Sequence, residues 1–397
     1  MKMSRSIPAN PNLDLLVWAR TSVGLDTEDA ARLLGVDRDQ LLKWESGSAR
    51  PSVAQLRKVA KEYRRSLAVF YLPEPPSGFE TLRDFRRIAG SEESTWSADL
   101  HEEFERALYQ RDCLLELYEL DDVAPAFSWV IEVNGEDENL ARSARELLLG
   151  SAQQPGRSAD AYAHLNFWLG RLEELGVLVH HTAGGDVAVT EMRAFSLYFD
   201  VLPVVVLNGA DAVKGRVFSL LHEFSHLLLR TGGLCDTTTE EGSLRPDRRI
   251  ETQCNRIAAS ILMPETEVLR NADVLTHQDE NTWDYESLRS AGSSFGVSAE
   301  AFCRRLATLD LVSDEYYRGW RSEFQKAYEA DLGMRKVSGG DWYRNKSRDL
   351  GKRYVRDVAS AWHRRVIDSA TAAMFLDAKV SQIPQLAEAA GLAGIRR

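Results

Sequence analysis

Residues 216–230 read RVFSLLHEFSHLLLR and place His222, Glu223 and His226 in an otherwise apolar run. Because residues four apart share one face of a helix, the two imidazoles can reach a single metal ion. Glu223 then lies beside the metal without ligating it, where it can take a proton from water and pass it to a leaving amine. Three ionisable side chains in an apolar helix would be costly to bury without a cation. The stretch therefore predicts a catalytic metal centre, and the alternatives are a chance match or histidines that only make core hydrogen bonds.

A catalytic zinc also needs a third protein ligand. The downstream candidates are Cys235, Asp236, Glu240, Glu241, Glu251 and His277. Glu251 begins the segment ETQCNRIAASILMP (251–264), whose apolar residues recur at helical spacing and which ends at Pro264. A carboxylate on a packed helix is held more rigidly than one in the polar loop DTTTEEG, so Glu251 is favoured. Asn255 shares the helix face of Glu251 and is expected to support the site.

Composition places the chain among globular proteins. Of its 397 residues, 44% are hydrophobic and 27% are charged, which suits buried cores in two or three domains. No apolar run reaches the roughly 18 residues of a membrane span, and the N-terminus has no stretch of signal-peptide length. A cytoplasmic protein without a membrane partner is therefore expected. The four cysteines form no CxxC pair, which argues against a disulfide framework or a cysteine-rich zinc site.

The periodicity along the chain predicts a mainly α protein with a small β-sheet, an α+β fold. Residues 12–72 read as a five-helix helix-turn-helix domain, and the proline-rich start of 73–94 marks a linker. Residues 95–300 form the expected metallopeptidase domain, a zincin-like HExxH domain with a helical lead-in and a motif core at 190–270. Residues 301–397 form a C-terminal helical region, for which no chemical motif is identified.

The expected sheet is built from short β-branched runs bounded by Gly, Asp and Pro. These runs are GVLVHH (176–181), DVAVT (186–190), AFSLYF (194–199) and PVVVLN (203–208), with SWVIEV (128–133) as a further strand. His180 and His181 are neighbours in the first run and so point to opposite faces of a strand, which favours core or surface roles over a shared zinc. His363 is expected on a solvated helix face.

The N-terminal helices have the pattern of a small DNA-reading module. Residues 1–71 hold 12 Lys and Arg against 8 Asp and Glu, in a chain whose net charge is −11. This head resembles the phage-repressor (XRE) type of helix-turn-helix at Ala30, Gly35, Val36, Trp44, Glu45, Gly47, Pro51, Leu56 and Ala60. The resemblance implies that the third helix enters the major groove. Arg38 and Gln40 are then candidates to reach base edges, and Lys43 or Arg50 to pair with phosphate.

The peptidase motifs resemble the ImmA/IrrE family of metallopeptidases over about residues 190–300. The matching positions are Asn208, Phe218, His222, Glu223, His226, Glu251, Asn255, Ala258, Leu262, Met263 and Pro264, and Cys254 stands where the family more often has alanine. The resemblance implies that His222, His226 and Glu251 bind zinc and that Glu223 is the general base. It also implies strands at 194–199 and 203–208, where an edge strand could hold an extended peptide by backbone pairing.

Together the two resemblances imply a regulator: a zinc-dependent endopeptidase that cleaves a helix-turn-helix repressor or another partner protein and itself binds DNA. Mn²⁺ or Fe²⁺ could occupy the same ligands. A single module binds DNA weakly, so a homodimer is expected for specific reading.

Two alternatives stay open. Asp37, Asp39 and Glu45 reduce the positive charge of the head, which leaves protein docking as a second role for it. The peptidase fold could also serve a non-proteolytic DNA-binding regulator or antitoxin as a protein-binding platform.

Overall fold

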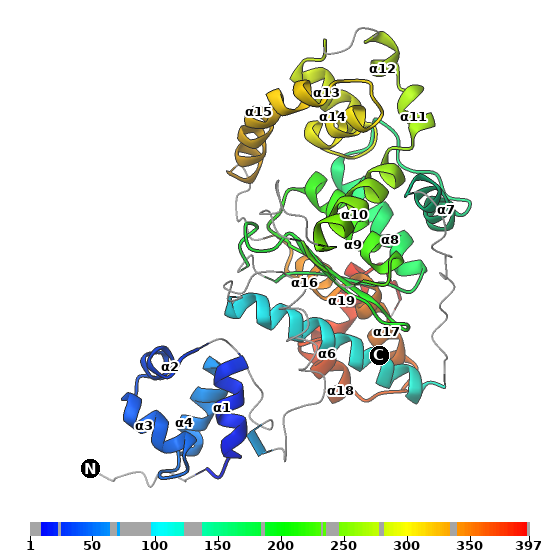
Figure 1. Ribbon diagram of the computed structural model, residues 1–397. Helices are drawn as coiled ribbons and strands as arrows, with labels where there is room; N and C mark the ends of the chain where they lie inside the picture. The colour runs from blue at the N-terminus through cyan, green and yellow to red at the C-terminus, as the bar shows by residue number, and fades with distance from the viewer. Residues whose placement is uncertain are drawn as a thin grey trace. The chain divides into compact units, whose positions relative to one another are not determined.

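The computed structural model falls into two compact units, Met1–Glu105 and Arg106–Arg397, and each is considered by itself. The residues that the structure describes are 9–22, 25–63, 70–71, 97–122, 137–183, 187–231, 233–235, 246–277, 282–333 and 340–394 (Figure 1). Most of the expected fifth helix of the head, the linker at 73–94 and the expected strand at 128–133 lie outside these residues. Within the described part, no helix is both long and apolar enough to cross a membrane.

Between residues 9 and 63, the described part of the first unit holds four short helices around one apolar core. They are α1 (Leu13–Ser22), α2 (Thr27–Leu34), α3 (Arg38–Glu45) and α4 (Val53–Glu62). Leu16, Ala19, Ala30, Leu34, Leu41, Trp44, Leu56 and Val59 are buried together between them. Asp26 caps α2, because its carboxylate accepts from the backbone N–H groups of Glu28 and Asp29. Gly35 ends α2 with a φ of 63°, a left-handed conformation that suits glycine.

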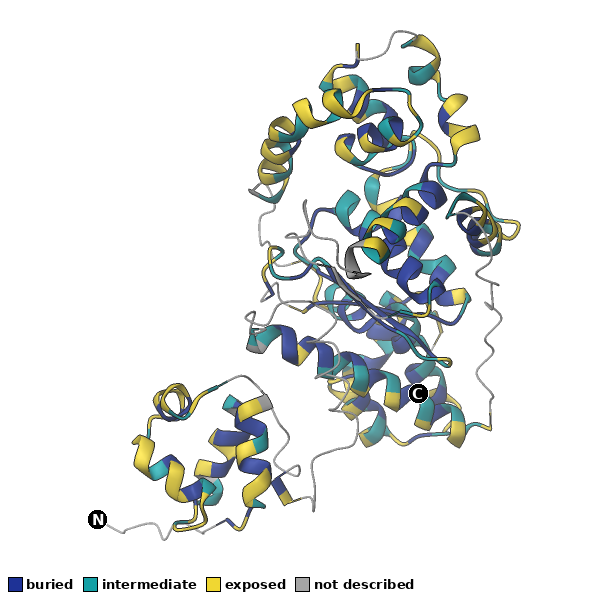
Figure 2. Cartoon of the chain, in the orientation of Figure 1, coloured by how far each residue is buried: buried dark blue, intermediate teal, exposed yellow. Residues whose placement is uncertain are grey.

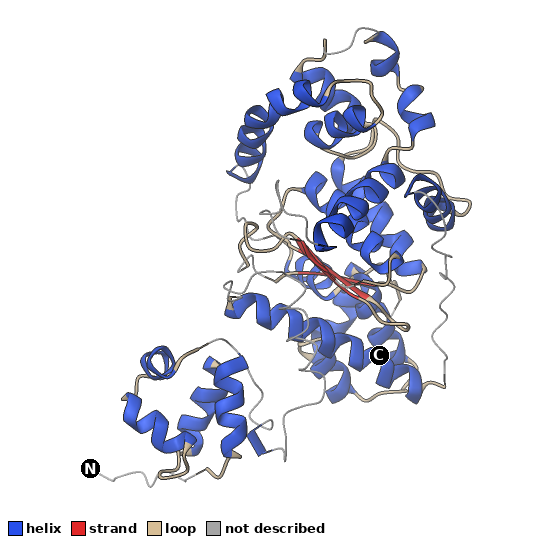
Figure 3. Ribbon diagram, in the orientation of Figure 1, coloured by secondary structure: helices blue, strands red, loops and turns tan. Residues whose placement is uncertain are grey.

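The second unit is built on a four-stranded sheet (Figure 3). Its strands are β1 (Leu178–His181), β2 (Ala194–Leu197), β3 (Val204–Leu207) and β4 (Gly233–Cys235), in the spatial order β1-β3-β2-β4. β1 runs parallel to β3, whereas β2 is antiparallel to both of its neighbours. The three expected strands at 176–181, 194–199 and 203–208 are confirmed, and β4 was not predicted. Because β2 and β3 are internal, the expectation of an edge strand among them is wrong; the edges are β1 and β4.

The expected strand at 186–190 is also wrong, since residues 187–190 make turns. The reason lies in Asn208, at the end of β3. Its buried side-chain amide donates to the carbonyls of both Val187 and Met192, at 3.0 and 2.8 Å. These two bonds hold the ends of the segment together, so the β-branched residues between them do not extend into a strand.

Helices cover both faces of the sheet (Figure 1). One face packs on α7 (Asp137–Leu149), α8 (Ala161–Glu174), α9 (Val213–Leu228) and α10 (Pro246–Leu262), and the buried residues of these helices form one continuous core with it (Figure 2). The other face lies toward α6 (Ala98–Leu120), α16 (Trp342–Leu350), α17 (Lys352–His363), α18 (Ser369–Phe375), η2 (Val380–Gln382) and α19 (Ile383–Ala389). Beyond α10 follow α11 (Glu265–Leu269), α12 (Ala272–Thr276), α13 (Tyr285–Ser293), α14 (Ala299–Thr308) and α15 (Asp314–Gly333). The mainly α fold with a small sheet is thus confirmed.

The C-terminal helices are joined closely to β1. His180 hydrogen-bonds through Nδ1 to the carbonyl of Leu350 at 2.7 Å, and its burial, together with the charge of Arg106, lowers the pKa of its imidazole to about 3. His181 is buried as well, so both histidines have the core role expected of them. Gly351 has a φ of 86°, and a Cβ at this position would lie only 2.5 Å from the carbonyl oxygen of Val179. A glycine is therefore required between α16 and α17.

Replacing this glycine should destabilise the second unit. Gly351→Ala combines left-handed strain with a backbone clash and should lower the free energy of unfolding by about 1–3 kcal/mol. The matched control is Gly319→Ala in α15, where a Cβ meets nothing within 4 Å and should add about 0.5–1 kcal/mol of helix stability. Urea unfolding of both variants measures the difference, and equal midpoints would contradict the close contact at Gly351.

Candidate metal centre and nucleic-acid interface

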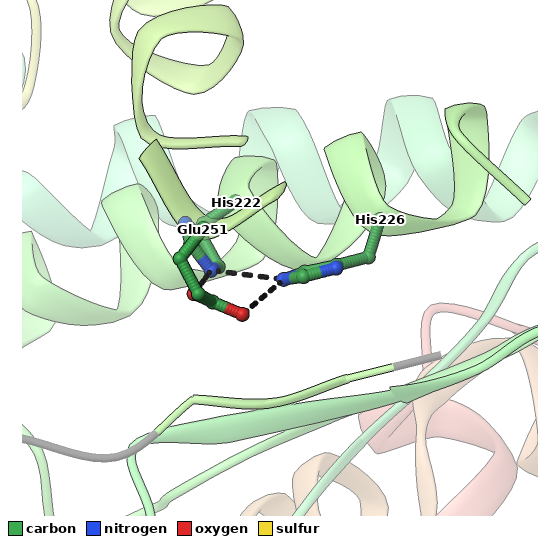
Figure 4. A group of neighbouring side chains, drawn as sticks. All are labelled: His222, His226 and Glu251. Carbon is green, nitrogen blue, oxygen red and sulfur yellow. Dashed lines mark hydrogen bonds and ion pairs between the residues drawn. The ribbon is translucent and has the colours of Figure 1, made fainter. Parts of the chain in front are cut away.

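Three side chains from two packed helices meet at one point (Figure 4). His222 and His226 lie one turn apart on α9, and their Nε2 atoms are 3.2 Å from each other. Glu251, near the middle of α10, brings Oε2 to 3.2 Å from Nε2 of His222 and Oε1 to 3.2 Å from Nε2 of His226. Both imidazoles are 2% exposed and the carboxylate is 22% exposed. Within the described residues, this is the group of ligand-type side chains that could hold a metal ion.

Two buried arginines fix the C-terminal end of α10. A helix leaves its last carbonyls without internal partners, and its C-terminus favours positive charge. Arg145 of α7 donates to the carbonyl of Ile261, and Arg305 of α14 donates to that of Met263 at 3.0 Å. Arg305 also pairs with Glu138 at 2.8 Å. The helix that presents Glu251 is thereby anchored from two neighbouring helices, and it ends at Leu262, just before the predicted stop at Pro264.

The outer nitrogens of both imidazoles have their own partners. Nδ1 of His222 is 3.1 Å from the side-chain oxygen of Asn255, the residue expected to support the site. Nδ1 of His226 is 3.2 Å from the hydroxyl oxygen of Thr231. An amide oxygen can only accept, so Nδ1 of His222 carries the hydrogen and its Nε2 presents a lone pair to the centre.

Glu223 is fully buried and contacts the sheet. Its Oε2 accepts a hydrogen bond from the hydroxyl of Ser196 on β2 at 2.6 Å. Its Oε1 is buried and makes no hydrogen bond to the residues that the structure describes. Burial raises the pKa of Glu223, against the effects of His226, His222 and the Ser196 hydroxyl. One oxygen is thus fixed by the sheet while the other is left for a further partner.

The sequence missed Ser196 and Thr231. Ser196 is the polar residue of the otherwise apolar, buried strand β2 (AFSL), and this was the signal for a buried polar partner. Thr231 follows α9 directly and gave no comparable signal, because its role depends on how the chain turns after the helix.

Of the other candidate ligands, His277 does not join the group. His277 stacks on Trp283 with ring centroids 4.1 Å apart, and its Nδ1 lies 2.7 Å from the carbonyl of Asp273. Cys235 belongs to β4, and the remaining candidates, Asp236, Glu240 and Glu241, fall outside the described residues. His363 is exposed at the end of α17, as expected.

Charges at the metal-free centre are set by burial and by close partners. Burial would raise the pKa of Glu251, but hydrogen bonds and charges from His222 and His226 lower it to about 2. Burial would lower the pKa of His226, but its hydrogen bonds with Cys254 and Glu251 raise it to about 10. The centre therefore favours a carboxylate beside a positive charge, which a proton or a metal ion can supply.

The predicted DNA-contacting residues lie on or next to α3. Arg38, Lys43 and Arg50 are exposed and Gln40 is half-buried. Nε of Arg38 donates to the hydroxyl of Thr27 at 3.2 Å, which ties the start of α3 to the start of α2.

Glu45 does not contribute a free negative charge to this surface. Arg20 of α1 pairs with it through two hydrogen bonds, at 2.7 and 3.2 Å, and both side chains are about one-tenth exposed. Of the three acidic residues that reduce the positive charge of the head, Glu45 is therefore neutralised by Arg20 inside the domain, whereas Asp37 and Asp39 are exposed.

Models of known protein families match a region in each of the two units. A family model of the IrrE N-terminal-like domain, a peptidase family, matches residues 172–307, and a helix-turn-helix model matches residues 16–70. The chain joins a helix-turn-helix domain to an IrrE-like peptidase domain. The IrrE-like match runs from the end of α8 into α14 and so includes the sheet, α9 and α10. Comparison with curated proteins and with solved structures finds no match.

Zinc binding to the IrrE-like domain should release a proton. In the metal-free protein His226, with a pKa of about 10, is protonated at neutral pH, whereas an imidazole ligand must be unprotonated. Each zinc bound at neutral pH should displace about one proton, so the affinity should rise about tenfold per pH unit as the pH increases toward the pKa of His226. Isothermal titration calorimetry in buffers of different ionisation enthalpy counts the proton. Binding that is independent of both buffer and pH would contradict this charge state.

Proposed function

We propose that the chain is a zinc-dependent endopeptidase that regulates transcription or a stress response, by cleaving a helix-turn-helix repressor or another partner protein. One observation carries the proposal. Two imidazole nitrogens and a carboxylate converge within 3.2 Å in a buried place, and the nitrogen of His222 that faces the centre is a lone-pair donor. Atoms this close and this electron-rich need positive charge beside them, which a proton on His226 supplies without metal and a bound metal ion would supply in its place.

The donor set suits a catalytic metal. Two imidazoles and one carboxylate are a common set for zinc that leaves a coordination position open for water or substrate, and Mn²⁺ or Fe²⁺ accept the same donors. His222, His226 and Glu251 would hold the ion. When bound, the metal would polarise the scissile carbonyl and lower the pKa of a water molecule.

The protein's own groups supply the proton transfers. Glu223 has one oxygen bound to Ser196, and its second oxygen, Oε1, is free to accept a proton from the attacking water. The same carboxyl group can then give this proton to the departing amine. Because the hydroxyl of Ser196 fixes Oε2, Glu223 need not be reoriented between the two transfers.

Glu223→Gln should separate metal binding from catalysis. Glutamine keeps the shape and the acceptor oxygen for Ser196 but cannot take up a proton, so cleavage should fall at least about 100-fold while the zinc content stays unchanged. The assay incubates the zinc-loaded protein with a purified repressor-type protein encoded by a neighbouring gene and follows discrete fragments by mass spectrometry. Cleavage retained by the variant would refute the role of Glu223. A wild-type protein that binds zinc, shifts DNA and cuts no such partner would favour the non-proteolytic regulator.

The head is proposed to bind DNA with α3 in the major groove, as a homodimer for specific reading. The exposed cations of this region and the internal neutralisation of Glu45 support this choice over protein docking.

Lys43→Ala should weaken binding to duplex DNA of any sequence by a similar factor. If Lys43 pairs with phosphate, the slope of log affinity against log salt concentration should fall by about one. The matched control is Arg57→Ala, which removes an exposed cation from α4 instead of α3. Fluorescence anisotropy with a labelled random duplex gives both slopes, and equal losses in the two variants would speak against α3 as the DNA-contacting helix.

A further inference from the structure

The chain turns back on itself directly after α9. Arg230 adopts a left-handed φ of 55°, which is uncommon for a residue with a side chain. The backbone N–H of Thr231 then donates to the carbonyl of His226 at 2.9 Å. This turn brings the side chain of Thr231 alongside the imidazole of His226, one helical turn back along the chain.

The hydroxyl of Thr231 makes two contacts with His226, and they determine where the imidazole hydrogen lies. Its one hydrogen is donated to the backbone carbonyl of His226 at 3.2 Å. The oxygen is 3.2 Å from Nδ1 of the same residue and, with its hydrogen already used, can only accept there. Nδ1 therefore carries a hydrogen, and in the neutral imidazole the lone pair is on Nε2, which faces His222 and Glu251.

We propose that Thr231 is a positioning residue of the metal centre, which fixes the ring orientation and the tautomer of His226 for a divalent cation. The proposal rests on the proposed function of His222, His226 and Glu251 as metal ligands. Threonine suits the task because branching at Cβ leaves few side-chain rotamers, so the hydroxyl is held in place at little entropic cost.

The two imidazoles are oriented by different parts of the fold. His222 is held by Asn255, which belongs to α10, the helix that also supplies Glu251. His226 is held by Thr231, which lies in the turn that follows its own helix. The Nδ1 side of His226 is thus oriented by the segment that directly follows α9, whereas the Nδ1 side of His222 is oriented from α10. Hydrogen-bond partners of this kind typically change metal affinity by about 10- to 100-fold when they are removed.

The test measures zinc affinity by competition with a chromophoric chelator, using the full-length protein stripped of metal. Thr231→Val keeps the branched shape without the hydroxyl and should weaken zinc binding by about 10- to 100-fold. Thr231→Ser keeps the hydroxyl and should restore affinity to within a few-fold of wild type. The matched control is Ser225→Ala, which removes a buried hydroxyl of α9 that bonds the carbonyl of Leu221 and should leave the affinity unchanged.

Thermal melting of the metal-free variants distinguishes positioning from a merely structural role. A Thr231→Val protein that melts like the Ser225→Ala control but binds zinc more weakly supports the proposal. Equal zinc affinity of wild type and Thr231→Val would overturn it, as would failure of Thr231→Ser to restore the affinity lost in Thr231→Val. If the wild-type protein itself binds no zinc, the proposed metal centre is wrong, whereas zinc binding unaffected by Thr231→Val refutes only the role of Thr231.

Discussion

The IrrE-like domain depends on the approach of one carboxylate to two buried imidazoles. Glu251 reaches both rings because α10 packs along α9. Its carboxylate oxygens and the Nε2 atoms of His222 and His226 would not stay together in a buried site without positive charge. The core supplies the packing on one side, and Arg145 and Arg305 supply fixed charge at the far end of α10. The position of the centre is therefore a property of the whole helical layer and of its contacts with the sheet.

The side chains of the candidate site are held by polar groups from different elements. The sheet fixes Glu223 through Ser196, α10 fixes His222 through Asn255, and the turn after α9 fixes His226 through Thr231. In the N-terminal helical head, Arg20 of α1 likewise pairs with Glu45 at the end of α3. Charged and polar groups that would destabilise an apolar core are tolerated because each has a directed partner.

Local patterns predicted the parts of the site that lie on single helices. The spacing of His222 and His226 required only helical geometry, and Glu251 followed from the periodicity of its own segment. The partners Ser196 and Thr231 could not be found this way, because one depends on the pairing of β2 with its neighbours and the other on a left-handed residue. The same limit explains the error at 186–190: its β-branched residues favour a strand, but two bonds from Asn208 close the segment into turns. Propensity describes a segment, whereas these outcomes depend on distant contacts.

The contacts along the outer edge of β1 affect any further strand that could pair with the sheet there. The chain at Gly351 passes close to the outward carbonyl of Val179, and the guanidinium of Arg106 donates to that of His181 at 2.6 Å. An incoming strand would have to compete with both groups, so this side is protected from the edge-to-edge association that exposed strands invite.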